Sequence, residues 1–302
     1  MGSIGRKGAR LALAGSSALL ATGALALYRR PFETVRSALR YGLRLSGISE
    51  RSVEVDGLPV RYLEAGPRDA GRTLVLVHGL AGSAVDWAFV IPALARNHRV
   101  LALDLPGFGD TPQPPEGMSF STLTRYLEGF PAALGVERVA LAGNSLGGAI
   151  AIRYAARNPE RVERLFLLNS AGLLYDAPPA LEPYTREQAR ELIELVTGAP
   201  SRSPGFVLDG MIRRSQDPAR RAYLRSAEPT DVRNDLPRVA APTTIIWGDR
   251  DRLIPPDHGE ALRTGIAGSE LVVLEGVGHV PQMQVPREIS RLFEERLRQG
   301  PS

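Results

Sequence analysis

The sequence predicts an α/β fold in which helices cover both faces of a mostly parallel sheet of eight strands. From residue 52 onward, short apolar runs alternate with stretches of helical spacing, which is typical of parallel strands joined by helices. A chain of 302 residues, of which 43% are hydrophobic and 23% charged, can also bury the large core that this fold needs. The same composition excludes a disordered chain.

The eight expected strands fall into two groups. Residues 52–56 and 59–64 predict an antiparallel hairpin that turns through Asp56-Gly57, a dipeptide typical of tight hairpins. The later runs are apolar throughout, as in a parallel sheet that is covered on both faces. These six runs are 73–77, 100–103, 139–142, 165–168, 243–247 and 271–274. We therefore assign 52–172 and 241–300 to the core of the fold.

The segment 173–240 interrupts this alternation. It is too long for one crossover between strands, and it is rich in Pro, Arg and Glu. We expect an inserted helical subdomain that covers the site as a lid. Eight of its apolar residues are candidates to line an acyl-binding channel, or else to form the small core of the lid itself. They are Leu173, Leu174, Tyr175, Leu192, Leu195, Phe206, Val207 and Leu208.

Charge is concentrated at the N-terminus. Residues 1–50 hold eight basic and two acidic residues, a charge of +6, whereas the remaining chain holds 29 basic and 31 acidic residues, a charge of −2. This second part shows no cluster of Arg and Lys, which a phosphate backbone would need, so we expect no nucleic-acid partner. A basic N-terminus instead favours contact with anionic lipid.

A basic segment at 1–10 precedes an uncharged run of 18 residues at 11–28. As a helix this run would be about 27 Å long at ~1.5 Å per residue, which nearly matches the hydrocarbon core of a bilayer. We expect a retained transmembrane signal anchor; the alternative is a signal peptide cleaved after Ala24-Leu25-Ala26. Small residues recur every four positions and are compatible with a homodimer through this helix. They are Ala14, Ala18, Thr22 and Ala26.

Residues 29–48 predict an amphipathic helix directly after the span. Apolar residues recur at helical spacing with arginines at neighbouring positions; they are Phe32, Val35, Leu39 and Leu43. Such a helix can lie on lipid headgroups, so we expect 11–48 to bind membrane lipids. The alternative is a surface helix docked on the body of the protein. Basic residues lie on both sides of the span, so charge alone does not set its orientation.

A G-x-S-x-G motif lies at Gly143-Asn144-Ser145-Leu146-Gly147. It follows an expected strand and begins an apolar helix, which is the context that this motif needs in a serine hydrolase. The glycines are required because side chains there would collide with the neighbouring strand and helix. We therefore expect Ser145 to be a nucleophile.

His279 is the best candidate among four histidines for the base that activates Ser145. It directly follows the last expected strand, and it comes last in the chain order Ser, acid, His. His98 and His258 are expected at the surface. His78 lies in a loop that has another expected role, described below.

The acid is expected in the loop after the strand 243–247. This loop reads Gly248-Asp249-Arg250-Asp251, whereas the strand 165–168 is followed by the uncharged Asn169 and Ser170. We assign Asp251, because the G-x-x-D spacing lets the loop turn back toward the histidine. Asp249 is the alternative; a carboxylate in such a loop can instead serve only as a cap or as the partner of an arginine.

An acyl-transfer site also needs two donors for the developing oxyanion. We expect the backbone N–H groups of Leu146, which follows the nucleophile, and of Leu80, in the loop after the strand 73–77. Cysteine is absent, and no cluster of His and carboxylate residues has the spacing of metal ligands. We therefore expect no metal and no other cofactor. The residues that bind the substrate stay unassigned.

In this order the motifs resemble the α/β-hydrolase superfamily. They are His78-Gly79, Asp104-Leu105-Pro106-Gly107-Phe108-Gly109, the turn at Ser145, Gly248 to Asp251, and Gly278-His279. The resemblance covers about 52–298 and implies the α/β-hydrolase fold. With its N-terminal helices and its Gly-Asn-Ser-Leu-Gly-Gly turn, the chain resembles membrane-anchored bacterial esterases and lysophospholipases. That implies a single-pass anchor in the inner membrane, a periplasmic catalytic domain and a Ser-His-Asp mechanism on acyl esters of lysophospholipids or phospholipids.

Two other functions stay open. Asn144 before the nucleophile is also typical of hydrolases that cleave carbon-carbon bonds in meta-ring-fission products. A non-catalytic, membrane-tethered receptor that kept the fold is the other possibility, although a complete triad makes it the weakest. Dehalogenases and epoxide hydrolases are disfavoured, because their nucleophile is Asp and position 145 is Ser.

Overall fold

The computed structural model describes residues 23–69, 71–174, 181–226 and 228–299. One sheet of eight strands crosses the molecule in the order β1-β2-β4-β3-β5-β6-β7-β8. β1 and β2 pair antiparallel, β2 and β4 pair antiparallel, and all other pairs are parallel. The predicted α/β-hydrolase fold with a mostly parallel eight-stranded sheet is confirmed.

All eight expected strands are present, with ends that shift by a few residues. The hairpin begins earlier than expected, because Ser49 already pairs with Glu64. The strands are β1 Ser49–Val55, β2 Leu58–Ala65, β3 Thr73–Val77, β4 Arg99–Leu103, β5 Val139–Asn144, β6 Val162–Leu168, β7 Thr243–Gly248 and β8 Glu270–Leu274.

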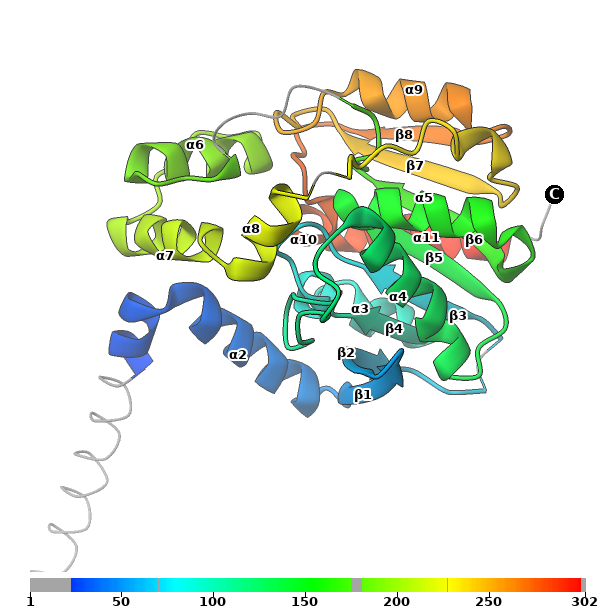
Figure 1. Ribbon diagram of the computed structural model, residues 1–302, viewed down its shortest axis with the longest axis horizontal. Helices are drawn as coiled ribbons and strands as arrows, with labels where there is room; N and C mark the ends of the chain where they lie inside the picture. The colour runs from blue at the N-terminus through cyan, green and yellow to red at the C-terminus, as the bar shows by residue number, and fades with distance from the viewer. Residues whose placement is uncertain (1–22, 70, 175–180, 227, 300–302) are drawn as a thin grey trace, which may run out of the picture.

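Helices cover both faces of the sheet (Figure 1), and each face has its own hydrophobic core. The first core is closed by α4 Phe120–Ala133, α5 Leu146–Arg157 and α9 Asp257–Gly265. The second is closed by η1 Ala84–Trp87, α3 Ile91–Leu94 and α11 Pro286–Arg298, with α10 Pro281–Gln284 beside them. Because both faces are covered, the central strands are buried throughout, as their continuous apolar runs predict.

In its described residues, the segment between β6 and β7 contains three α-helices that extend beyond one end of the sheet (Figure 1). They are α6 Arg186–Thr197, α7 Gly205–Ser215 and α8 Pro218–Leu224. Leu192 and Leu208 are buried, and Leu192 belongs to the first core, which is the structural alternative to a channel-lining role. Leu174 is exposed, and Tyr175 lies outside the described residues.

The N-terminal helix α2 Pro31–Leu45 docks on the body of the protein. Its Leu43 enters the second core. Its arginines face carboxylates: Arg40 lies 3.1 Å from the buried Asp104, and Arg44 contacts Glu50 at 2.5 Å. The arginines that we expected to face lipid headgroups therefore have protein partners, as in the docked-helix alternative.

Residues 23–29 are helical, and the first twelve residues of the expected span, 11–22, lie outside the described residues. Within the part of the chain that the structure describes, no helix has the length and the apolar character needed to cross a bilayer. The basic segment 1–10 also lies outside the described residues.

Candidate active site

Ser145 lies in a sharp turn between β5 and α5. Its backbone has φ +56° and ψ −122°. Residues other than glycine rarely adopt this conformation, which costs about 1–3 kcal/mol. The glycines of the motif permit this turn, because a Cβ atom on Gly143 would lie 2.2 Å from the carbonyl oxygen of Gly147. A Cβ atom on Gly147 would lie 2.4 Å from the carbonyl oxygen of Val77. The glycines of the motif are therefore required by close backbone contacts around the strained Ser145 turn, as the sequence predicts.

Hydrogen bonds to β6 and to the residues after it fix the backbone of this turn. The N–H group of Ser145 donates to the carbonyl oxygen of Leu168 at 3.1 Å. The carbonyl oxygen of Ser145 accepts from the N–H group of Ala171 at 3.0 Å and from the first turn of α5. The half-buried Ser145 side chain is thereby held at the carboxyl end of the central strands.

His279 and Asp251 form a buried hydrogen-bonded pair. The Nδ1 atom of His279 lies 2.7 Å from Oδ2 of Asp251, and both side chains are almost completely buried. The other oxygen of Asp251 accepts the backbone N–H groups of Leu253 and Ile254 at 2.8 and 3.0 Å. Because Nδ1 of the imidazole is held by the carboxylate, Nε2 is the atom that faces other partners. It has no hydrogen-bond partner among the described residues.

Asn169 is part of this network and was not assigned a role from the sequence. Its side-chain amide donates to Oδ2 of Asp251 at 2.7 Å, and its carbonyl oxygen accepts the N–H group of Gly248 at 3.3 Å. It is completely buried and has φ +42°. The sequence signal for Asn169 is its position directly after β6, at the same end of the strands as Ser145, but a neutral side chain does not mark a catalytic acid.

Asp249 has a different place in the same loop. Its side chain is exposed, and Oδ1 accepts the backbone N–H group of Gly276 at 2.7 Å. It therefore caps the loop that leads to His279, the structural role that we kept open for a carboxylate here. Of the two candidate acids, the structure brings Asp251 to the histidine.

Asn144 connects the nucleophile turn to the histidine loop. Its side-chain amide donates to the carbonyl oxygens of Leu168 and His279, both at 3.0 Å. Its side-chain oxygen accepts the amide of the buried Gln282 at 3.1 Å. These three bonds occupy the Asn144 side chain within the protein. Its presence therefore does not by itself distinguish one substrate class from another.

The loop after β3 packs against Ser145. A Cβ atom on Gly79 would lie 3.1 Å from the Cβ atom of Ser145. The next residue, Leu80, and the residue after the nucleophile, Leu146, have backbone N–H groups that donate to no described residue. Both groups are therefore free to donate to another acceptor, which an oxyanion hole requires.

His78 is buried and has a structural role between two loops. Its Nε2 atom accepts the N–H group of Leu105 at 2.9 Å, so Nδ1 carries the proton and donates to the carbonyl oxygen of Gly79 at 2.7 Å. His78 thereby ties the loop after β3 to the loop after β4. Among the described residues, no group of three or more His, Asp or Glu side chains is placed to hold a metal ion.

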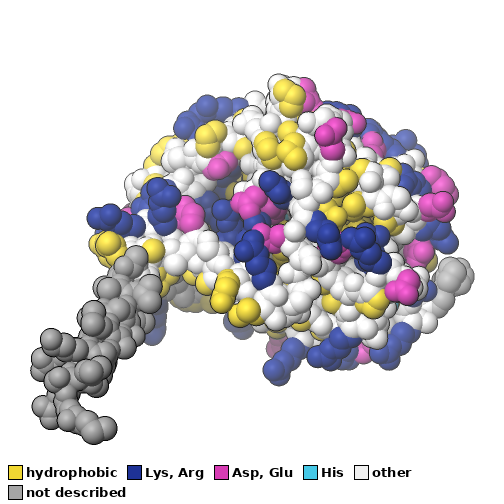
Figure 2. All heavy atoms as spheres, turned by 90° about the horizontal axis from the view of Figure 1, so that it is seen from below, with side chains coloured by type: hydrophobic (Ala, Val, Ile, Leu, Met, Phe, Trp, Pro, Cys, Tyr) yellow, Lys and Arg dark blue, Asp and Glu magenta, His cyan; other side chains and the backbone are white. Residues whose placement is uncertain are grey.

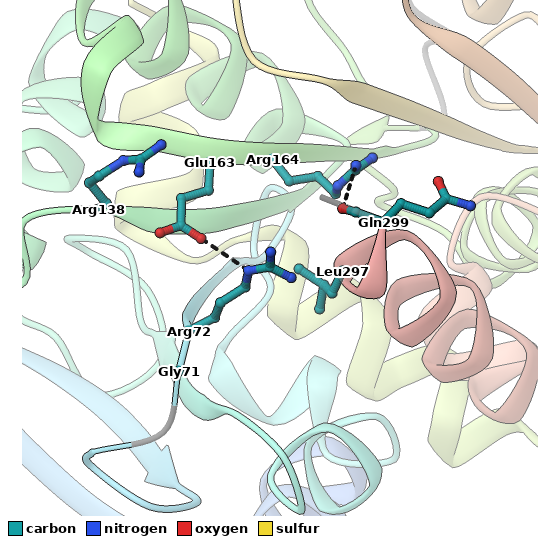
Figure 3. A pocket seen from close by; sticks show the side chains of 7 residues that line it. All are labelled: Gly71, Arg72, Arg138, Glu163, Arg164, Leu297 and Gln299. Atoms are coloured by element: carbon teal, nitrogen blue, oxygen red, sulfur yellow. Dashed lines mark hydrogen bonds and ion pairs between the residues drawn. The ribbon is translucent and has the colours of Figure 1, made fainter. Parts of the chain in front are cut away.

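Two arginine-lined pockets lie near opposite ends of the strands. One, of about 400 Å³, lies between α2, α7 and the loops that follow β3 and β4. The other, of about 280 Å³, lies at the amino ends of β3, β5 and β6 (Figure 3). There Arg72 pairs with Glu163 at 3.3 Å, and Arg164 donates to the carbonyl oxygen of Gln299 at 3.4 Å. Ser145 and His279 lie at the carboxyl edge, so only the first pocket is on their side.

Residues 74–292 match the alpha/beta hydrolase family. The chain belongs to this family. A 2-hydroxy-6-oxo-2,4-heptadienoate hydrolase from Pseudomonas putida is 33% identical over 273 residues, which make up 82% of this chain and 95% of that protein. The family establishes that the protein is a hydrolase of this superfamily, while its members differ in the bond that they cleave.

Two solved structures show how far the likeness extends. A membrane phospholipase A, described as a bacterial virulence factor, is 32% identical, with a TM-score of 0.79; the match covers 95% of this chain and 98% of that one. A meta-cleavage product hydrolase from Pseudomonas fluorescens is 27% identical, with a TM-score of 0.71, and the match covers 83% of this chain and 97% of that one. The similar proteins therefore include both a phospholipase and hydrolases of meta-cleavage products and dienoates.

Proposed function

We propose that this protein is a serine ester hydrolase of EC class 3.1.1 that cleaves acyl esters of lysophospholipids or phospholipids at a membrane. The observation that carries the proposal is the extent of the match to the membrane phospholipase A. That match covers 95% of the chain, and 5% of 302 residues is about 15, so it includes much of the 48 residues before β1. The matches to dienoate and meta-cleavage product hydrolases cover 73–85% of the chain.

In this proposal Ser145 attacks the ester carbonyl carbon while Nε2 of His279 takes its proton. Asp251 holds the imidazole through Nδ1 and stabilises the positive charge that develops on it. The N–H groups of Leu80 and Leu146 donate to the oxyanion. The alcohol part leaves with the proton from His279, and a water molecule, activated by the same histidine, releases the fatty acid from Ser145.

The N-terminal segment supports a membrane location for this activity. Of the large hydrophobic side chains that are exposed in the described residues, six lie between positions 25 and 45: Leu25, Leu27, Tyr28, Val35, Tyr41 and Leu45. In our proposal residues 11–28 anchor the protein in the bacterial inner membrane, with the catalytic domain in the periplasm, and residues 11–48 contact lipid. A homodimer through the anchor remains part of this proposal.

Fractionation tests the anchor. The proposal expects the protein to stay in the membrane after alkaline carbonate treatment and to keep its original N-terminus. Release as a soluble protein that begins at Leu27 would instead identify a cleaved signal peptide. Crosslinking of an Ala18→Cys variant in membranes tests the dimer, and loss of association in Ala18→Leu is the matched control.

The ester specificity is tested with the detergent-extracted protein. We expect turnover of p-nitrophenyl butyrate, of longer p-nitrophenyl esters and of lysophospholipids. A complete lack of ester turnover by the folded protein would favour the non-catalytic receptor. Bulky substitutions at Leu195 or Phe206, both half-buried in the lid, should shift the preferred chain length if the lid selects the acyl group.

The second candidate is hydrolysis of a carbon-carbon bond in a ring-fission product. It is favoured by the names of similar proteins, including the P. putida enzyme. Asn144, which is typical of these enzymes, gives this candidate little support, because its side chain is hydrogen-bonded within the protein. A 2-hydroxy-6-oxo-dienoate is the substrate that separates the two candidates.

A further inference from the structure

The 400 Å³ pocket at the carboxyl edge is built jointly by the core, the lid and the N-terminal helix. Its walls come from α2, from 81–83 after β3, from 107–109 after β4, and from 210–218 in the lid. Figure 2 views the molecule from below, where Lys and Arg, Asp and Glu, and hydrophobic side chains are interspersed. The pocket lining likewise contains both arginines and aromatic side chains, among them Phe32 and Phe108.

The pocket adjoins the loop that packs on Ser145. Ala81, one of its lining residues, follows Leu80, whose N–H group is an expected oxyanion donor. The guanidinium of Arg214 donates to the carbonyl oxygen of Ala81. Gly79, two residues earlier, approaches the nucleophile itself. The pocket is thus lined in part by the loop that also packs against the nucleophile.

Two arginines of this pocket form no close ion pair, although Asp209 acts electrostatically on Arg213 and Asp86 on Arg214. Arg213 donates to the carbonyl oxygen of Arg29 at 2.7 Å, and Arg214 donates to a carbonyl oxygen and lies over the ring of Phe32 at 5.6 Å. Neither forms an ion pair with a carboxylate among the described residues. A carbonyl partner satisfies a donor but leaves the positive charge, so both guanidinium groups remain able to bind an anion.

The other charged groups around the pocket include carboxylates, most of which already have partners in the protein. Arg36 lies 3.5 Å from Asp110, and Oδ1 of Asp217 is occupied by the N–H groups of Ala219 and Arg220. Glu33 also lines the pocket, on the exposed side of α2.

Arg220 adds further positive charge from within the lid. Its side chain is buried, and desolvation together with the like charge of Arg214 lowers its pKa. Arg220 thus places a third guanidinium group behind Arg214.

We propose that this pocket binds the phosphate group of the lipid substrate, through Arg213 and Arg214, while the acyl ester lies at Ser145. The inference rests on the proposed function and names the part of the substrate that the protein recognises. A guanidinium group presents parallel N–H donors that match phosphate oxygens. In a glycerophospholipid the phosphate and the ester are separated only by the glycerol carbons, which fits a pocket next to the oxyanion loop.

The test compares two substrates with the same acyl chain, lysophosphatidylglycerol and the uncharged monoacylglycerol, in detergent micelles. Arg213→Gln and Arg214→Gln should each lower kcat/KM for the phosphate-bearing substrate about tenfold more than for monoacylglycerol, mainly through KM. The Lys variants at these positions should recover part of the loss. Arg138→Gln, in the pocket at the amino edge, removes the same charge and should leave the ratio of the two substrates unchanged.

Equal losses on both substrates would show that the arginines only support the fold of the loop, and an unchanged ratio would refute the phosphate site. A lysophospholipid ether, which has no ester bond, separates this inference from the proposed function. Its Kd should rise about tenfold in the same two variants even if the ester activity were absent. Binding of inorganic phosphate that depends on Arg213 and Arg214, without any effect on the ether lipid, would assign the pocket to free phosphate and overturn the lipid assignment.

Discussion

The catalytic edge of the sheet and the helices around it are held together by different kinds of contact. Ser145, Asp251 and His279 are fixed by short hydrogen bonds between buried groups, several of them to backbone. α2 is joined to the core partly by arginines that are less buried than this network, since the side chains of Arg36 and Arg40 are 32% and 15% exposed. Buried networks are rigid and costly to disturb, whereas exposed ion pairs are worth little each. The first region thus suits chemistry, and the second suits substrate selection.

The nucleophile should show the largest effect. In the proposed mechanism Ser145→Ala removes the atom that attacks the substrate, so kcat should fall by roughly 10⁴ to 10⁶ for every ester tested. Thermal unfolding should confirm that the variant is folded. If Ser145→Ala kept substantial turnover, Ser145 would not be the nucleophile.

The two aspartates of the loop after β7 provide the next contrast. Asp251→Asn should lower kcat by roughly 10³ to 10⁴, because the amide can hold the imidazole in the wrong tautomer. Asp249→Asn removes only the cap on Gly276 and should cost less than about tenfold. The opposite order of effects would exchange the assigned acid and its alternative.

Asn169 should have an intermediate effect. Asn169→Ala removes one donor from the Asp251 carboxylate and is expected to lower kcat about tenfold, with KM nearly unchanged. The pH profile of kcat separates two roles for Asn169. A residue that positions Asp251 should change this profile, whereas a residue that only supports the local structure should not. If KM rose while kcat and its pH profile stayed the same, Asn169 would not act through the acid.

The smallest effect is expected where α2 meets the core. Arg40→Gln removes the ion pair with Asp104 and should lower stability by about 1 kcal/mol, which corresponds to a fall in Tm of roughly 2–4 °C. Asp104 keeps its bonds to the N–H groups of Ala84 and Asp110 at 2.6 and 2.9 Å. Turnover of p-nitrophenyl butyrate should stay unchanged. A large loss of that turnover would make α2 part of the catalytic region.

Much of the fold followed from the sequence, because the apolar runs of a parallel sheet are continuous and the glycines of the nucleophile turn are required by close backbone contacts. His279 and Asp251 lie together in the structure for the same reason: each follows a strand at the same edge. Asn169 also follows such a strand, but a neutral amide gives no charge signal, and its role depends on a hydrogen bond across 82 positions of the chain.

The partners of α2 illustrate what the sequence left open. The amphipathic pattern at 29–48 fits a lipid surface and a docked helix equally well. The choice depends on whether carboxylates of the core lie opposite the arginines, and this follows only from the tertiary structure, in which Asp104 and Asp110 sit in the loop after β4. The sequence likewise gave no indication of the pocket between α2 and α7.

The central claim, that the protein is an ester hydrolase of phospholipids, is tested most directly by competition in one vessel. The detergent-extracted wild-type protein is given a lysophospholipid together with a 2-hydroxy-6-oxo-dienoate, and fatty-acid release is measured beside the loss of dienoate absorbance. With both substrates at equal concentration, the ratio of the two rates gives the ratio of the kcat/KM values. We expect that ratio to favour the lysophospholipid by at least about 100-fold, since the two substrates differ in charge, shape and the bond to be broken. Faster consumption of the dienoate would contradict the proposal and identify a carbon-carbon bond hydrolase.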